Sequence, residues 1–249
     1  MKVSIITITR NSELTLKDTI DSVVNQSYQN IEYIFIDSKS TDNTLPIIQS
    51  YGNKISILIS EKDDGLYDAL NKGIALATGD IIGILHSDDF YVNNKVIENV
   101  VNTLTNKNAD ALYADLYYVE KNNTNIIHRK WKSGNYTDGM FLNGWMPPHP
   151  TFFVKREIYK QFGSFNLNLT SAADYELMLR FIHKQKIKLA YLPEFIIKMR
   201  VGGKSNISIK NRMIANKEDR LAWKINNLKP NFYTLYLKPI RKIMQLFVK

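Results

Sequence analysis

The sequence predicts an α/β protein with a doubly wound, mostly parallel β-sheet, and two observations carry that prediction. First, short segments rich in β-branched residues recur at 3–9, 31–37, 55–60 and 81–85, as expected for strands that are buried on both faces. Second, segments whose apolar residues repeat with helical spacing lie between them, joined by short connections. In sheets of this kind, ligands bind at the carboxyl ends of the strands.

The helices of the first half have recognisable ends. Asn11 or Ser12 can cap the first helix, and Gly79 is expected to close the third. A dinucleotide-binding fold and a P-loop are both disfavoured, because neither of their glycine motifs is present. The predicted helices cover residues 14–26, 44–52 and 65–79.

The second half of the sequence is less regular. A helix at 94–107 and a strand at 109–120 are expected first, and the segment NNTNIIHRKWKSG then predicts a hairpin. A proline-rich bend precedes a short strand at 151–154 and a helix. Residues 172–185 have helical spacing, and KLAYLPEFIIKMRV predicts one or two further strands.

The composition describes an ordinary soluble globular protein of 249 residues, 44% hydrophobic and 23% charged. The absence of cysteine excludes disulfides, zinc–thiolate sites and cysteine nucleophiles, and it fits a reducing, cytoplasmic compartment. The net charge of +9 resides in residues 204–249, which carry 11 Lys and Arg against two acids. Because the rest of the chain is neutral, we expect no nucleic-acid partner.

The basic tail ends in a segment with amphipathic spacing. From Pro239, a favoured first helical residue, Ile240, Ile243, Met244 and Phe247 fall on one stripe. A short basic amphipathic helix predicts contact with an anionic membrane surface, while packing on the domain or an oligomer contact are the alternatives. The sequence has no run of about 18 apolar residues and no signal-peptide pattern, so we expect neither a membrane span nor a leader.

The clearest chemical signal is the pair Asp88 and Asp89, which follows the apolar run at 81–85. Adjacent carboxylates repel each other, and neither gains from entering a core. A Mg²⁺ or Mn²⁺ ion bound by carboxylate and by substrate phosphates would explain the pair. Such a cation neutralises the charge that builds on a departing phosphate. Solvated turn carboxylates or a helix cap are the plain alternative.

Further polar residues follow the neighbouring strands. Asp37 ends the second strand, where its carboxylate could accept a hydrogen bond from a base imide or from ribose hydroxyls. Glu61 and Asp63 follow the third strand, and one of them could orient Arg10 or contact a nucleotide. Asp174 stands at a helix start and could take a proton from a sugar hydroxyl as general base. For each residue, a turn or capping role is the alternative.

Three segments resemble the family 2 glycosyltransferases, which are inverting enzymes of the GT-A fold that use nucleotide-diphosphate sugars. The segments are VSIITITRNSELTLKDTIDSVVNQSYQNIEYIFIDSKSTDNT, SEKDDGLYDALNKGIALATGDIIGILHSDD and SAADYELMLR. Their order and spacing fit the family as well as the segments themselves. The resemblance implies a GT-A domain over 1–203, with a nucleotide-sugar-binding half at 1–95 and an acceptor half at 96–203, followed by the basic helical tail at 204–249.

The resemblance also implies a role for each residue at the strand ends. Thr9 and Asn11 would line the nucleotide site, and Asp37 would hold the base. Asp88 would lie against the ribose or the diphosphate. Asp89 would be the metal ligand of the so-called DXD motif.

The implied reaction moves a hexosyl or N-acetylhexosaminyl group, with Asp174 as the base that deprotonates the acceptor hydroxyl. Attack from the face opposite the nucleotide then inverts the anomeric carbon. Family habit and Asp37 favour a UDP-sugar as donor. Family habit also implies a saccharide or lipid-linked saccharide at the inner membrane face as acceptor, in surface polysaccharide synthesis. A nucleotidyltransferase and a non-catalytic sugar-nucleotide-binding protein are the alternatives. The first should carry a glycine-rich loop after strand one, which TRNSELTLK lacks, and the second should have lost an acid.

A few positions depart from the family pattern or lie outside it. Ser38 stands where a second acid is common, and His86 stands where Asn or Asp is usual, so His86 could contact a phosphate or sugar or could merely pack. His149 lies in a loop, GWMPPHP, expected on the acceptor side. The glycine pair in VGGKSN could hinge a loop over the diphosphate, with Lys204 or Arg200 pairing with phosphate, although a plain linker is the alternative.

Overall fold

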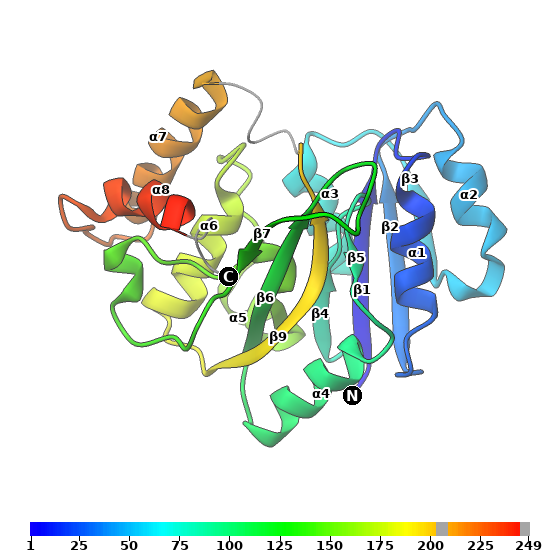
Figure 1. Ribbon diagram of the computed structural model, residues 1–249, viewed down its shortest axis with the longest axis horizontal. Helices are drawn as coiled ribbons and strands as arrows, with labels where there is room; N and C mark the ends of the chain where they lie inside the picture. Colours follow the sequence, from blue (N-terminus) through cyan, green and yellow to red (C-terminus); the bar gives the residue numbers. More distant parts are fainter. Residues whose placement is uncertain (203–208, 245–249) are drawn as a thin grey trace.

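A computed structural model describes residues 1–202 and 209–244 of the chain (Figure 1). Within these residues one nine-stranded sheet forms the centre of the molecule. The strands of the first half are β1 (Val3–Thr9), β2 (Ile31–Asp37), β3 (Ile57–Ser60) and β4 (Ile81–Ile84). Those of the second half are β5 (Phe90–Tyr91), β6 (Ala111–Val119), β7 (Ile127–Trp131), β8 (Phe153–Lys155) and β9 (Leu189–Arg200).

The strand order is β3-β2-β1-β4-β8-β6-β9-β5, and β7 pairs with β6 as the predicted hairpin. Strands β1 to β4 are parallel, whereas β8 is antiparallel to both of its neighbours, β4 and β6. The register aligns Thr9 with Asp37 and Asp37 with Ser60. The carboxyl ends of the first three strands therefore meet at one edge, and the predicted fold class is confirmed.

The first-half helices are α1 (Leu16–Val24), α2 (Thr44–Ser50) and α3 (Leu66–Leu76). Helices α1 and α3 lie on opposite faces of the sheet (Figure 1). Gly73 permits α3 to approach the strands, because a Cβ at this position would lie 2.5 Å from Cγ2 of Ile6. The segments rich in β-branched residues thus fold as strands, and those with helical spacing of apolar residues fold as helices, as the sequence predicts.

Two predicted helix ends were wrong. Helix α1 begins after Thr15 without a side-chain cap, because Asn11 and Ser12 belong to the preceding turn. Helix α3 ends at Leu76, and Gly79 lies instead against β1, where a Cβ would be 2.6 Å from Oγ of Ser4. This glycine is needed for close approach of two backbones rather than for closing a helix.

The second-half helices are α4 (Val96–Asn106), α5 (Arg156–Phe162) and α6 (Ala173–Met178). Helix α6 continues as a π-helical segment over Leu179–Lys184, so the single helix predicted at 172–185 has two parts. A 3₁₀ turn at His149–Thr151 leads from the proline-rich loop into β8. Strand β9 is one long strand with register shifts opposite Ala114 and Asp115.

The C-terminal part consists of α7 (Ile209–Ile225) and α8 (Thr234–Met244), which pack on α6 and on the turn at Met140–Asn143 (Figure 1). Helix α8 begins at Thr234, not at Pro239 as predicted. Gly144 allows the close contact with α8, because a Cβ there would lie 2.6 Å from the backbone nitrogen of Lys238. In the part of the chain that the structure describes, no helix is long and apolar enough to cross a membrane.

Candidate active site

The loops that follow β1, β2 and β4 are tied together by hydrogen bonds. Asn11 adopts a left-handed conformation with φ of 52°, and its side-chain oxygen accepts a hydrogen bond from the backbone N–H of Thr41 at 2.9 Å. Ser12 Oγ lies 2.9 Å from Ser87 Oγ, and Thr15 donates to the Ser87 carbonyl at 2.9 Å. Three loops far apart in sequence therefore form one polar rim at the carboxyl edge of the sheet.

Asp37 is completely buried beneath this rim. Its carboxylate accepts hydrogen bonds from Thr9 Oγ1 at 2.9 Å, from Ser60 Oγ at 2.7 Å and from the backbone N–H of Ser40 at 3.0 Å. Ser40 Oγ donates a fourth, at 2.5 Å. Both carboxylate oxygens are thus occupied by protein donors, and the carboxylate holds the loop after β2 in place.

Glu61 and Asp63 bind Lys72 of α3 rather than Arg10. The Lys72 ammonium lies 2.7 Å from a carboxylate oxygen of each acid, and 3.3 Å from Asp68. These contacts raise the pKa of Lys72 above its ordinary value, with the hydrogen bonds to Asp63 and Glu61 as the largest causes. Ser38 also donates a hydrogen bond to Asp63. Arg10 is exposed at the rim.

Asp89 differs sharply from the other acids at this edge. Its side chain is buried, and neither carboxylate oxygen has a hydrogen-bond partner among the described residues. Burial and the adjacent Asp88 carboxylate raise its pKa well above the ordinary value, although the nearby backbone N–H of Arg200 and the charge of that residue act in the opposite direction. A buried carboxylate without donors is costly unless a ligand compensates it, and a divalent cation is a ligand that would do so.

Residues 1–202 and 209–244 contain no group of three or more His, Cys, Asp or Glu side chains that could hold a metal. Mg²⁺ and Mn²⁺ do not need such a group, because Mg²⁺ commonly binds through one or two carboxylates plus substrate phosphates and water. Asp89 therefore fits a cation that reaches the site together with a phosphorylated substrate. Such an ion would neutralise charge on a departing diphosphate.

Arg200 at the end of β9 supports the turn that carries Asp88 and Asp89. Its guanidinium donates to the Asp88 carbonyl at 2.6 Å, forms an ion pair with Asp18 of α1, and lies 4.9 Å from the centre of the Phe90 ring. The side chain is 5% exposed. Arg200, one of the two phosphate-pairing candidates from the sequence, is therefore held within the protein. Lys204, the other, lies outside the described residues.

Asp174, in the first turn of α6, faces two side chains from other elements. Tyr67 at the start of α3 donates to one carboxylate oxygen at 3.3 Å, and Nδ1 of His149 lies 3.3 Å from the other. Asp174 is about a quarter exposed, so it is accessible from solvent while held on both sides. Burial, and then the charge of Asp174, raise the pKa of Tyr67.

His86 connects the Asp174 side of the site to the Asp88–Asp89 turn. The rings of His86 and His149 meet edge to face, with centroids 5.6 Å apart. Burial lowers the pKa of His86, while the charges of Asp88 and Asp174 act to raise it. The charges of both acids therefore act on His86. The loop after β4, the turn at His149–Thr151 and helix α6 meet at this place.

Two contributors to this region were not predicted from sequence. Tyr67 follows the acidic turn SEKDDG at a helix start, and helix starts after parallel strands face the ligand edge, so its position carried a usable signal. The position of Arg129 of β7 could not be predicted from sequence, because it depends on the register of the irregular β6–β7 hairpin. Its guanidinium lies 3.9 Å from the centre of the Tyr118 ring, and Tyr118 is within electrostatic reach of both Asp89 and Asp174.

The site thus has two chemically distinct positions at one edge of the sheet. One is a buried carboxylate, Asp89, suited to a cation with a diphosphate. The other is an accessible carboxylate, Asp174, suited to receiving a proton.

Comparison with known proteins identifies the family and the fold. Residues 4–163 match the family model described as Glycosyl transferase family 2. An uncharacterised glycosyltransferase of Mycobacterium tuberculosis is 32% identical over 180 residues, which cover 72% of this chain and 68% of that protein. A PGL/p-HBAD biosynthesis glycosyltransferase of Mycobacterium bovis is 26% identical over 216 residues, covering 85% of this chain and 82% of its own.

Solved structures share the fold. TarS of S. aureus, residues 1–349 in complex with UDP-GlcNAc, superposes with a TM-score of 0.72 at 18% identity, covering 91% of this chain and 65% of that one. The mannosyltransferase PcManGT of Pyrobaculum calidifontis, in complex with GDP-Man and Mn²⁺, gives a TM-score of 0.67 at 16% identity, covering 95% of this chain and 68% of that one. The chain also spans 64% of the length of an uncharacterised glycosyltransferase of Rickettsia typhi, to which it is 29% identical over 206 residues that cover 80% of this chain. On the family match and this fold, the chain belongs to the family 2 glycosyltransferases.

Proposed function

We propose that the protein is an inverting glycosyltransferase in which Asp174 is the general base and Asp89 binds the metal ion of a nucleotide-diphosphate sugar. The observation that carries the proposal is the pairing of an accessible carboxylate, held by Tyr67 and His149, with a buried carboxylate that accepts no hydrogen bond from residues 1–202 and 209–244. Each carboxylate suits one half of a displacement at the anomeric carbon.

The reaction proposed is a single displacement. An acceptor hydroxyl loses its proton to a carboxylate oxygen of Asp174 while its oxygen forms a bond to the anomeric carbon. The bond from that carbon to the donor's phosphate oxygen breaks, and the electron pair leaves with the nucleoside diphosphate. Attack from the opposite face inverts the configuration, as in inverting glycoside chemistry. His149 orients the Asp174 carboxylate toward the acceptor.

A UDP-sugar is the proposed donor. TarS is described in complex with UDP-GlcNAc and with UDP, whereas PcManGT is described with GDP-Man, so the fold accommodates more than one nucleotide. The rim formed by Thr9, Asn11 and the loop that Asp37 holds would receive the nucleotide. Because Asp37 is saturated by protein donors, we propose that it acts on the base through the position of this loop.

The acceptor proposed is a saccharide on a lipid carrier, reached from the cytoplasmic face of a membrane. Tyr236 and Ile240 lie four residues apart on α8 and are 63% and 48% exposed, and Phe232, in the turn just before α8, is 89% exposed. Lys229 and Arg241 are exposed in the same part of the chain. Exposed apolar side chains in the same segment as exposed cationic ones suit an anionic lipid surface.

The activity is tested with a panel of nucleotide sugars, with and without Mn²⁺ or Mg²⁺, by following release of nucleoside diphosphate. Asp174→Asn should lose turnover but keep donor binding, and NMR of the product should show an inverted anomeric centre. Glu157→Gln, an exposed acid on α5, is the matched control and should behave as the wild type. Turnover in Asp174→Asn, or a retained configuration, would contradict the proposal.

The membrane contact has its own test, by sedimentation with phosphatidylglycerol vesicles and with neutral phosphatidylcholine vesicles. The full chain should sediment with the anionic vesicles only. Phe232→Ser with Tyr236→Ser should weaken this binding without changing turnover on a soluble acceptor. Equal recovery of the variant and the wild type on anionic vesicles would refute the contact.

A further inference from the structure

The segment that carries Asp174 is held from outside by α7. Residues 170–172, just before α6, have no side-chain cap of their own, since Ala172 occupies the capping position. The carboxylate of Glu218 accepts hydrogen bonds from the backbone N–H groups of Thr170 at 3.0 Å, Ser171 at 2.7 Å and Ala172 at 3.0 Å. It also accepts one from Thr170 Oγ1 at 2.6 Å.

These bonds tie the loop before α6 to a residue that is 46 to 48 positions away in sequence. The three N–H groups lie in the loop that leads into α6, and that of the buried Ala172 is the costliest to leave unpaired, so removing Glu218 would take the protein acceptor from several donors at once. Burial opposes ionisation of Glu218, yet the hydrogen bonds from Thr170, Ser171 and Ala172 hold its pKa below the ordinary value. The charged form is therefore the one that fixes the segment.

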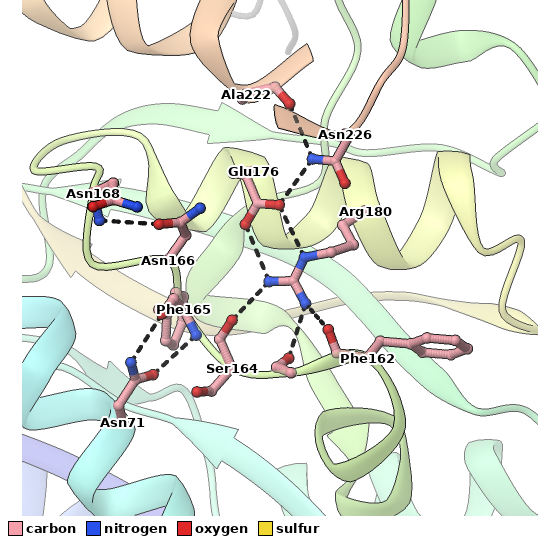
Figure 2. A network of polar contacts seen from close by, with 11 residues as sticks. Asn71, Phe162, Ser164, Phe165, Asn166, Asn168, Glu176, Arg180, Ala222 and Asn226 are labelled. Carbon is pink, nitrogen blue, oxygen red and sulfur yellow. Dashed lines mark hydrogen bonds and ion pairs between the residues drawn. The ribbon is translucent and has the colours of Figure 1, made fainter. Parts of the chain in front are cut away.

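A second set of contacts fixes the other side of α6 (Figure 2). Arg180 binds Glu176 at 2.9 Å and donates to the carbonyls of Phe162, Gly163 and Ser164. Asn226, which directly follows α7, donates to Glu176 at 2.8 Å. Trp223 of α7 donates to the Tyr175 hydroxyl at 2.9 Å. With the later turns of α6 fixed by these contacts, residues 170–172, which directly precede the first turn that carries Asp174, are the part of the segment whose position depends on Glu218.

We propose that Glu218 is a positioning residue for Asp174, so that α7 forms part of the catalytic unit. The proposal rests on the proposed role of Asp174 as base. A general base must lie within hydrogen-bond reach of the proton that it removes, and small misplacements reduce turnover steeply. Donor binding is served by other loops, at the ends of β1, β2 and β4, and does not depend on Glu218.

The test compares Glu218→Ala and Glu218→Gln with Asp219→Asn in the full chain. Asp219 is the neighbouring buried acid on α7, but it binds Lys238 of α8, at 2.6 and 2.7 Å, and not the 170–172 segment. We expect Glu218→Ala to lower kcat about 10²-fold, since misplacement of about 1 Å costs that much, with the donor Kd unchanged. Glu218→Gln keeps one acceptor oxygen and should recover part of the loss.

Asp219→Asn should lower Tm, because it breaks a buried ion pair, yet keep kcat within about twofold at temperatures where it is folded. Hydrogen exchange gives a readout apart from activity: the amides of Thr170, Ser171 and Ala172 should exchange faster in Glu218→Gln and at the wild-type rate in Asp219→Asn. If Glu218→Ala does not fold, Glu218→Gln carries the comparison.

The outcomes separate this inference from the function on which it rests. Wild-type kcat in the Glu218 variants, together with loss of turnover in Asp174→Asn, would overturn the positioning role and leave the function intact. Full turnover in Asp174→Asn would overturn both. A fall in kcat shared equally by Asp219→Asn would assign the effect to general destabilisation and also overturn the positioning role.

Discussion

Asp37 and Asp89 are both buried aspartates at the carboxyl edge of one sheet, but their surroundings are opposite. Asp37 accepts four hydrogen bonds from Thr9, Ser40 and Ser60, whereas the oxygens of Asp89 accept none from the described residues. A saturated carboxylate stabilises its own loop, and an unsaturated one is costly until a ligand arrives. Burial of an acid therefore does not identify a binding residue, but an absence of donors around a buried acid points to one.

The largest effect is expected at Asp89, where the comparison predicts loss of activity without loss of stability. Asp89→Asn should lower turnover about 10²–10³-fold, the several kcal/mol of charge stabilisation that a metal supplies. Its Tm without metal should equal or exceed that of the wild type, because a buried carboxylate without donors is removed. Differential scanning fluorimetry with and without Mn²⁺ and a donor measures the Tm, and release of nucleoside diphosphate measures turnover. A rise in the Tm of Asp89→Asn on addition of Mn²⁺ and donor, as large as that of the wild type, would contradict the assignment.

Asp37→Asn should have the opposite effect to Asp89→Asn, because its main consequence should be a loss of stability. Replacing a saturated carboxylate weakens several charge-assisted bonds, so the free energy of unfolding should fall by about 2–4 kcal/mol. Urea unfolding measures the change. Ser60→Ala removes one of the donors to Asp37 and should lower the free energy of unfolding by about 1 kcal/mol. If Asp37→Asn unfolds like the wild type but binds no donor, Asp37 contacts the nucleotide directly.

Glu32, at the amino end of β2, extends the comparison to a saturated acid far from the site. Burial opposes its ionisation, but hydrogen bonds from Lys2, Ser4 and Thr78 lower its pKa from 4.5 to about 2. Since the folded pKa is depressed, the stabilisation is present above the unfolded value and is lost as pH falls toward 2.

Glu32→Gln should therefore lower the free energy of unfolding by about 2–3 kcal/mol at pH 7, with little difference from the wild type near the folded pKa. Urea unfolding at a series of pH values measures the gap between the two proteins. A gap that stays constant with pH would show that Glu32 contributes through packing alone.

The smallest effect is expected at His149, on the open side of the site. His149→Gln should lower turnover about tenfold, because the imidazole no longer orients Asp174, and should change the unfolding free energy by less than about 0.5 kcal/mol. Single-turnover kinetics and urea unfolding on the same preparation measure the two quantities. A loss of stability larger than the loss of activity would place His149 among the scaffold residues.

Much of the fold was predictable because local signals agree with it. The β-branched runs of β1, β2 and β4 and the apolar periodicity of α1 specify a parallel sheet without help from distant residues. The sequence also drew attention to Asp88 and Asp89, because two carboxylates after a buried strand conflict with a purely structural role, and the metal-binding role of Asp89 stays a prediction.

What could not be predicted depends on partners from distant turns. The donors to Asp37 include Ser40 and Ser60, and only the aligned register of the parallel strands brings Ser60 to it. The bonds from residues 170–172 to Glu218 join residues nearly fifty positions apart, with α6, β9 and part of α7 between them. The start of α8 was misplaced because Pro239, a favoured first helical residue, here lies inside the helix.

The docking of α7 and α8 has a consequence for making chimeras of such enzymes. The family match ends at residue 163, which invites an exchange of everything beyond that point between relatives. A donor segment starting there would bring α8 without the turn at Met140–Asn143, whose close packing requires Gly144. A workable crossover lies before residue 140, so that the turn, the proline-rich loop, α6 and both C-terminal helices are inherited together.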